Sequence, residues 1–154
     1  MLNSHLKTKC AEKNRTWGNT FVIMVDIDNF KSINDKYWHP KWDEVLKNIA
    51  NIFKETFRQE DVVWRWWGEE FLVILSWMDV SDVEKKIENL RKNIESSLHM
   101  KSGLDNSITI SSWISNLCKW DINWNAATKL ADNALYKAKH EWKNKVVINL
   151  REEK

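Results

Sequence analysis

Apolar residues occur along the chain in short runs and in helical stripes. Short runs that alternate or are continuous indicate strands, whereas apolar residues three or four positions apart indicate one face of a helix. The strand pattern occurs in five segments, at 20–28, 61–66, 69–75, 106–115 and 145–150. The helical pattern occurs in three segments, at 42–57, 81–98 and 125–140.

Two of the predicted helices each have a clear apolar stripe. The stripe of segment 42–57 consists of Val45, Leu46, Ile49, Ile52, Phe53 and Phe57. The stripe of segment 81–98 consists of Val83, Ile87, Leu90 and Ile94. In the second segment Ser81 and Glu84 have the spacing of a capping box, which predicts that Ser81 is the N-cap. We expect both helices to cover a sheet.

The order of these elements is strand, helix, strand, strand, helix, strand, helix, strand. This order predicts an α+β fold in which helices flank a mostly antiparallel sheet. No internal repeat and no Pro- or Ser-rich linker interrupts the pattern. We therefore expect one domain over 20–150, preceded by a remnant or linker at 1–19 and followed by a short tail at 151–154.

The composition is that of an ordinary water-soluble domain, apart from its tryptophan and glycine. Of 154 residues, 43% are hydrophobic and 30% charged, and the net charge of +2 gives no reason to expect a nucleic-acid partner. No apolar run approaches the ~18 residues of a membrane span, and the N-terminus is too polar for a secretory signal, so we expect a cytoplasmic domain. The chain has 11 Trp and only 3 Gly.

Acidic residues end one predicted strand and open another. Asp26 and Asp28 lie at the end of segment 20–28, where alternation puts them on one face and Ile27 on the other. Glu69 and Glu70 open segment 69–75. If these strands are neighbours, three or four carboxylates meet and repel one another unless a cation neutralises them. Hard oxygen ligands suit Mg²⁺ completed by substrate phosphates. Simple solvation is the alternative, and it is favoured for Asp26 taken alone.

Three lysines are candidates for binding phosphate. Lys31 follows the first acidic pair closely, and Lys139 and Lys143 are four positions apart at the end of segment 125–140. A solvated basic helix end is the alternative, since it is favourable to the helix dipole. Spacing alone favours that alternative for Lys139 and Lys143.

Three segments carry a family resemblance: "DIDNFKSINDKYWHPKWDEVL", "RWWGEEF" and "LADNALYKAKHEWKNKV". Together they resemble the GGDEF domain of diguanylate cyclases, in its GGEEF variant. The similarity runs over about 21–148, with the motifs in family order, and is far more specific than one short motif. It implies a fold similar to adenylyl cyclase and polymerase palm domains. It also implies condensation of two GTP molecules into cyclic di-GMP with release of pyrophosphate.

The resemblance also implies roles for individual residues. Mg²⁺ or Mn²⁺ would be bound by Asp26, Glu69 and the Ile27 carbonyl, with Glu70 as a second catalytic acid. Substrate would be bound by Lys31, Asn34, Asp43, Gly68, Lys139 and Lys143. Among these, Asn34 and Asp43 would hydrogen-bond guanine and the lysines would bind phosphates. Whether a Glu or a metal-bound water takes the hydroxyl proton stays open.

A further motif, "RQED", lies just before segment 61–66, where the family often has an RxxD site for product inhibition. The resemblance implies that cyclic di-GMP binds at Arg58 and Asp61. Arg91 is a weaker candidate for a supporting contact there. The alternative is a surface ion pair.

The chain departs from the family at glycine positions. Tryptophan stands where glycine is usual at Trp38, Trp42, Trp67, Trp113 and Trp142, with further candidates at Trp17, Trp64, Trp77 and Trp120. Such glycines often have positive φ, where a Cβ costs roughly 1–2 kcal/mol, so we expect strain at these sites. We also expect Trp38, Trp42 and Trp67 to crowd the GTP site. Drift would scatter many residue types, so the repeated Trp favours systematic substitution or a misread sequence over natural decay.

Three functions are consistent with these patterns. The first is a diguanylate cyclase that acts as a homodimer, with one GTP held by each protomer. The second is a catalytically degenerate domain that binds GTP or cyclic di-GMP, and the third is a dimerisation domain. An N-terminal segment common in the family is missing. We therefore expect an upstream sensor module in a longer parent protein, for which a membrane anchor stays open.

Overall fold

A computed structural model describes residues 19–36, 39–101, 108–117 and 143–152. Its elements, in chain order, are β1 (Thr20–Ile27), α2 (Phe30–Lys36), α3 (His39–Thr56), β2 (Val62–Trp67), β3 (Glu70–Ser76), α4 (Val80–Lys101), β4 (Ile110–Asn116) and β5 (Val146–Ile148). Each predicted strand is present, as are two of the predicted helices. The third, at 125–140, lies outside the described residues. The short helix α2 was not predicted.

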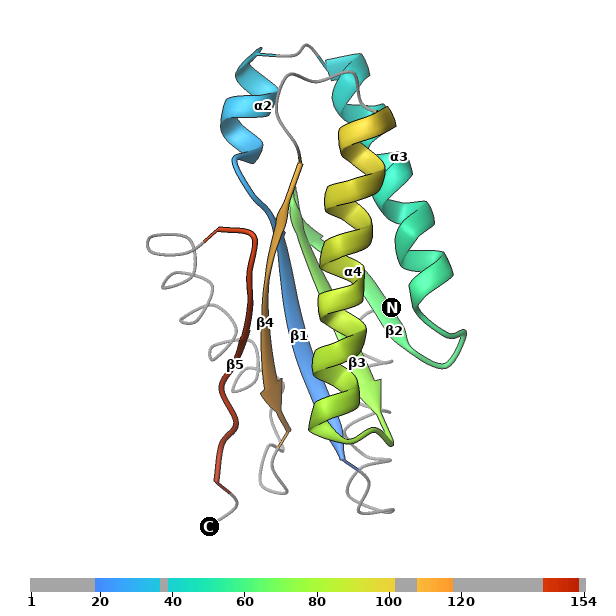
Figure 1. Cartoon of the computed structure of the whole chain (residues 1–154), viewed down its shortest axis with the longest axis vertical. Coiled ribbons are helices and arrows are strands. Elements are labelled where there is room, and N and C mark those ends of the chain that lie inside the picture. The colour runs from blue at the N-terminus through green and yellow to red at the C-terminus, as the bar shows by residue number, and fades with distance from the viewer. Residues whose placement is uncertain (1–18, 37–38, 102–107, 118–142, 153–154) are drawn as a thin grey trace.

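The strands form one mixed sheet with the order β2-β3-β1-β4-β5 (Figure 1). The pairs β1/β3, β1/β4 and β2/β3 are antiparallel, and only β4/β5 is parallel. The predicted α+β fold with a mostly antiparallel sheet is therefore confirmed. Strand β1 lies at the centre, and all its residues are buried.

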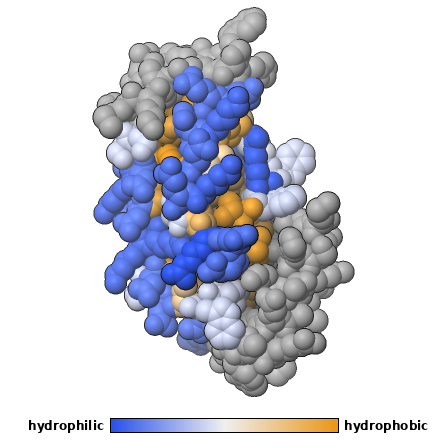
Figure 2. Space-filling model, turned by 90° about the vertical axis from the view of Figure 1, so that its right-hand side faces the viewer, coloured by the Kyte–Doolittle hydropathy of each residue, from blue (hydrophilic) through white to orange (hydrophobic). Residues whose placement is uncertain are grey.

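One face of the sheet packs against α3 and α4. The residues of β1 on this face are Phe21, Ile23, Val25 and Ile27, which share a core cluster with the stripes of both helices. All four predicted stripe residues of α4 are fully buried, and Leu46 and Ile52 of α3 are partly buried. Seen from the right-hand side of Figure 1, the outer surface is mainly hydrophilic around a smaller apolar area (Figure 2). Both helices thus turn their apolar stripes inward.

The opposite face of the sheet holds the alternate residues of β1. Val22 and Met24 form a second cluster there with Leu72 of β3 and Leu117. Asp26 has the same parity as Val22 and Met24, so the alternation of the strand puts it on this second face. None of the described helices is both long enough and apolar enough to cross a bilayer.

The start of α4 differs from the sequence prediction. The backbone N–H groups of Asp82 and Val83 donate to the carbonyl of Asp79, at 3.1 and 3.0 Å. Asp79 is therefore the N-cap, and the prediction of Ser81 as N-cap is wrong. Asp and Ser cap helices about equally well, so local preference alone could not separate them.

Most of the described tryptophans avoid the backbone conformation of glycine. Among the described residues other than glycine, φ is positive only at Asn29 (58°), Trp77 (64°) and Asn144 (56°). The expected backbone strain is therefore wrong for Trp42, Trp64, Trp67 and Trp113, and it applies to Trp77. Positions Trp17, Trp38, Trp120 and Trp142 lie outside the described residues.

Candidate functional site

Two carboxylates face each other where β1 ends and β3 begins. Asp26 is directly opposite Glu70 in the antiparallel register. Directly opposed residues lie on the same face of a sheet, with Cβ atoms about 5 Å apart. The backbone N–H of Ile27 donates to the carbonyl of Glu69 at 3.2 Å, which joins the turn before β3 to the end of β1. The expectation that the two acidic segments are neighbours is therefore confirmed.

A cavity of about 760 Å³ opens at this end of the sheet. Its described lining consists of Asp26, Ile27, Asp28, Asn29, Phe30, Lys31, Ser32, Asp35, Glu69 and Lys143. All three predicted metal ligands are in this set, together with two of the three predicted phosphate-binding lysines. The volume is in the range of ligand pockets, which is roughly 300–1,000 Å³.

The chemistry of this donor set fits a divalent cation that also binds substrate. Asp26, Glu69 and the Ile27 carbonyl supply hard oxygen atoms, which Mg²⁺ prefers. Among the described residues, however, no three His, Cys, Asp or Glu side chains are grouped so that they could hold an ion by themselves. The expected meeting of carboxylates at one edge of the sheet is nevertheless confirmed, since Asp26, Asp28 and Glu69 line the cavity and Glu70 lies opposite Asp26. Asp26, Glu69 and the Ile27 carbonyl therefore suit an ion whose coordination is completed by phosphate oxygens and water.

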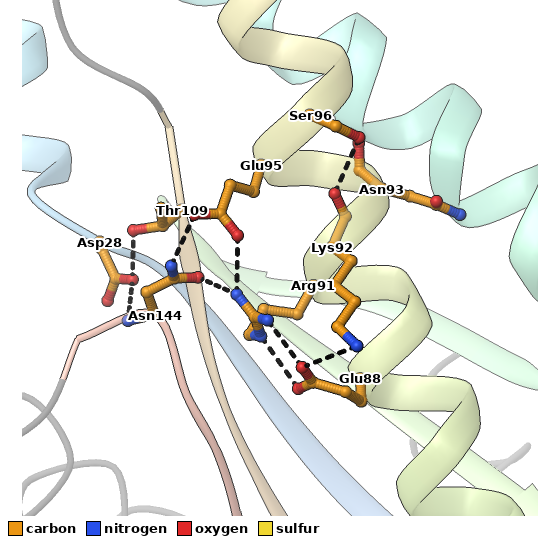
Figure 3. Close-up of polar contacts among 9 residues, drawn as sticks. All are labelled: Asp28, Glu88, Arg91, Lys92, Asn93, Glu95, Ser96, Thr109 and Asn144. Carbon is orange, nitrogen blue, oxygen red and sulfur yellow. Dashed lines mark hydrogen bonds and ion pairs between the residues drawn. The ribbon is translucent and has the colours of Figure 1, made fainter.

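Asp28 is committed to structural contacts instead. Its Oδ2 accepts hydrogen bonds from Thr109 Oγ1 at 2.7 Å and from the Asn144 backbone N–H at 2.8 Å (Figure 3). Its Oδ1 accepts from Ser111 Oγ at 2.7 Å. Both carboxylate oxygens of this buried side chain are thus used to fasten the end of β1 to β4 and to the segment before β5.

Two lysines line the same cavity as the acids. The Nζ of Lys143 donates to Oδ1 of Asn29, the residue that follows Asp28. Lys31 is exposed on α2 and lines the same cavity. Lys143 lies in a bend before β5 and lines the cavity. This position differs from the alternative considered for it, a solvated basic helix end. Lys139 lies outside the described residues.

The predicted guanine-binding pair is less clearly placed. Asn34 belongs to α2 and Asp43 to α3. Asp43 is exposed and is not among the described residues that line the cavity.

The hairpin tip between β2 and β3 is open. Gly68 has φ 39°, and no described heavy atom lies within 4 Å of a Cβ built on it. The Nε of Arg65 donates to the Gly68 carbonyl at 2.8 Å, which stabilises the turn.

Trp67 is 77% exposed, and Trp42 is buried in the core with its ring centroid 4.5 Å from that of Phe30. Neither indole is among the described residues lining the cavity, and the expected crowding of bound GTP by Trp42 and Trp67 stays a prediction. Trp38 lies outside the described residues.

The RxxD segment forms a turn on the surface. The backbone N–H of Arg58 donates to Oδ2 of Asp61 at 2.9 Å, and Lys86 Nζ donates to the same oxygen at 3.2 Å. The guanidinium of Arg58 is exposed, 3.8 Å from Glu60. A second cavity, of about 510 Å³, is lined by Ala50, Phe53, Lys54, Phe57, Arg58, Gln59, Asp61, Val63, Arg65 and Phe71.

Arg91 is engaged elsewhere. It donates to Glu88, Glu95 and Asn144, and only 12% of its side chain is exposed. The hydrogen bonds from Arg91 hold the pKa of Glu88 below its usual value. The structure therefore gives Arg91 a role in a network around Asn144, and it does not support the expected contact at the RxxD site. Sequence reasoning missed Asn144, although an Asn next to a candidate lysine can signal a left-handed turn.

Comparisons with known proteins identify the family of the chain. A family model described as "Diguanylate cyclase, GGDEF domain" matches residues 1–145. Probable diguanylate cyclase DgcT of Escherichia coli is 36% identical over 129 residues, covering 82% of this chain and 28% of that protein. Diguanylate cyclase A of Treponema denticola is 35% identical over 152 residues, covering 97% of this chain and 40% of that protein. The chain thus spans less than half of the length of either relative.

Solved structures of similar fold extend over nearly the whole chain. The active GGEEF domain of a diguanylate cyclase from Vibrio cholerae has a TM-score of 0.85 and 28% identity, covering 97% of this chain and 94% of that one. The GGDEF domain of DgcB from Caulobacter crescentus, in complex with c-di-GMP, has a TM-score of 0.85 and 25% identity, covering 96% and 87%. The opposed acids at the end of β1 and β3, the cavity beside them and these matches lead to one conclusion: the chain belongs to the diguanylate cyclase GGDEF-domain family.

Proposed function

We propose that this domain condenses two molecules of GTP into cyclic di-GMP and pyrophosphate, and that the reaction depends on Mg²⁺ or Mn²⁺. The observation that carries the proposal is the convergence of Asp26, Glu69 and the Ile27 carbonyl with Lys31 and Lys143 around one cavity. Acidic oxygens beside two ammonium groups can bind a metal–triphosphate complex, in which both signs of charge are present.

The site residues assigned in this proposal divide into two groups. Asp26, Glu69 and the Ile27 carbonyl hold the cation, with Glu70 beside them, and Lys31, Lys139 and Lys143 bind the phosphates. When bound, the cation neutralises charge on the α-phosphate and on the departing pyrophosphate. The lysines hold the triphosphate so that its α-phosphate faces the 3′-hydroxyl of a second GTP.

Recognition of the base is assigned to α2 and α3, which carry the predicted guanine-binding pair. Asn34 and Asp43 would hydrogen-bond the edge of guanine, and adenine would leave these polar groups unpaired. Gly68 lies at the hairpin tip with open space around its Cα, which allows the triphosphate to approach the backbone. Because each protomer holds one GTP, two copies of the domain must face each other across a two-fold axis.

The test is product formation from GTP and MgCl₂, measured by chromatography for cyclic di-GMP. We expect product from the unmodified chain and a loss of at least about 100-fold in Glu69→Gln, since the removed charge lies at the cation. Glu84→Gln is the matched control, because Glu84 is exposed on α4. No product from the unmodified chain, or equal activity in both variants, would contradict the proposal.

A second candidate function is binding of cyclic di-GMP without catalysis. It is favoured by the second cavity, where Lys54, Arg58 and Arg65 lie around the apolar Phe53 and Phe71. Arginine can hold a phosphate or a guanine edge through two parallel hydrogen bonds. A calorimetric titration with cyclic di-GMP should show weaker binding in Arg58→Ala than in a Lys47→Ala control. Equal affinity in both variants would exclude this site.

A further inference from the structure

A continuous series of polar contacts connects α4 to the segment that carries Lys143 (Figure 3). Arg91 Nη1 donates to Oδ1 of Asn144. The Nδ2 of Asn144 donates to Glu95 Oε1 at 2.9 Å, and its backbone N–H donates to Asp28 Oδ2 at 2.8 Å. One residue, Asn144, therefore joins α4 to the end of β1 through both its side chain and its backbone.

Arg91 is itself fixed by two acids of its own helix. Its Nε and Nη2 donate to the two carboxylate oxygens of Glu88, at 2.9 and 2.6 Å. Its Nη1 also donates to Glu95 Oε2 at 2.9 Å. A bidentate pair sets both the position and the plane of a guanidinium. Since only 12% of the Arg91 side chain is exposed, the Nη1 that contacts Asn144 has little freedom to move.

Asn144 places its neighbour at the cavity. Asn144 has φ 56°, a left-handed conformation that Asn adopts more readily than most residues. The preceding residue, Lys143, lines the cavity together with Asp26 and Glu69, and its Nζ contacts Asn29. The backbone contact of Asn144 with the buried Asp28 side chain thus holds the chain at the point where Lys143 leaves it.

We infer that Arg91 and Asn144 are positioning residues that hold the Lys143 ammonium group at the nucleotide cavity. What Lys143 binds rests on the proposed function, whereas the mechanical connection from α4 to Lys143 does not. None of the described cavity-lining residues belongs to α4. The inference nevertheless gives this helix a direct physical connection to the site.

The test combines two variants with a matched control. Arg91→Met removes the guanidinium, and Asn144→Gly removes the side-chain bridge while tolerating the positive φ. Lys92→Met is the control, because Lys92 is an exposed neighbour on α4 whose Nζ lies 3.8 Å from Glu88. In calorimetry with Mg²⁺ and GTP, the two test variants should bind roughly three- to tenfold more weakly than the control. In a Lys143→Met background, adding Arg91→Met should change affinity by less than about twofold.

Hydrogen exchange supplies a readout that needs no nucleotide. The amides of residues 144–146 should exchange faster in Arg91→Met and Asn144→Gly than in Lys92→Met, while the amides of β1 and β3 stay unchanged. Unchanged exchange at 144–146 overturns the inference. An equal loss of GTP affinity with and without Lys143 also overturns it, because Arg91 would then act by another route. If the unmodified chain does not bind GTP, the proposed function fails and the exchange comparison alone decides the inference.

Discussion

At Asp26 the requirements of folding and of chemistry oppose each other. The side chain is buried, and it lies directly across from Glu70 in the sheet. Like charges at directly opposed positions destabilise a sheet, by up to about 1 kcal/mol. A divalent cation bound at the same oxygens would remove that repulsion. The opposed acids that the proposed reaction needs therefore carry a repulsion in the metal-free fold.

Asp26→Asn should consequently stabilise the metal-free domain and abolish turnover. In thermal unfolding with a chelator present, we expect the variant to be more stable by roughly 0.5–1 kcal/mol, because the opposed pair then carries one charge. Addition of Mg²⁺ should stabilise the unmodified chain more than the variant. Lower stability of the variant in the chelator would show that Asp26 contributes more through its own contacts than it loses to repulsion.

Trp77 has a backbone conformation that suits glycine. Its φ is 64°, and its side chain is 65% exposed, so little apolar burial offsets the strain. Trp77→Gly should therefore raise the free energy of unfolding by about 1 kcal/mol. The matched control is Trp64→Gly: this indole is 42% exposed but lies within β2, where glycine lowers stability. Urea unfolding measures both changes, and a loss of stability at position 77 would contradict the strain argument.

At the scale of elements, periodicity explains what the sequence could predict. The alternation in β1 puts Asp26 and Ile27 on opposite faces, and the helical stripes predict which sides of α3 and α4 are buried. The helix α2 escaped this reasoning because its seven residues are too few to show a stripe. The bridge from Arg91 to Asn144 spans 53 positions, and no local pattern contains it. It exists because the fold brings α4 beside the segment before β5.

The ion pair on α4 makes a pH-dependent contribution to stability. Hydrogen bonds from Arg91 lower the pKa of Glu88 below its ordinary value of 4.5. The contribution is therefore fully present above pH 4.5 and is lost as the pH falls through the lowered folded-state value. Glu88→Gln should be less stable than the unmodified chain at pH 7, by less than about 1 kcal/mol because the group is partly exposed, and this difference should shrink as the pH falls below 4.5. Unfolding titrations across this range test it, with Glu84→Gln as the exposed control. A difference that persists undiminished at pH 3 would show that packing, and not charge, is responsible.

For the whole molecule, the sheet order explains how distant segments form one site. Strand β1 lies between β3 and β4, so its end meets both the hairpin turn before β3 and, through Asp28, the segment before β5. In the proposed reaction, a single copy of the domain supplies only one of the two substrate sites. The proposal assigns one GTP to the cavity of about 760 Å³, whereas the proposed product contains two guanosine monophosphate units.

Turnover should therefore depend on the concentration of the domain more steeply than binding does. At concentrations below the dissociation constant of the dimer, the specific activity should fall roughly in proportion to dilution, because active pairs form by mass action. The affinity for GTP of a single copy should stay constant over the same series. Chromatography for cyclic di-GMP at increasing dilution, paired with sedimentation at each concentration, gives both quantities. A constant specific activity across a range in which sedimentation shows only monomer would mean that one copy completes the reaction, and the two-fold arrangement would have to be abandoned.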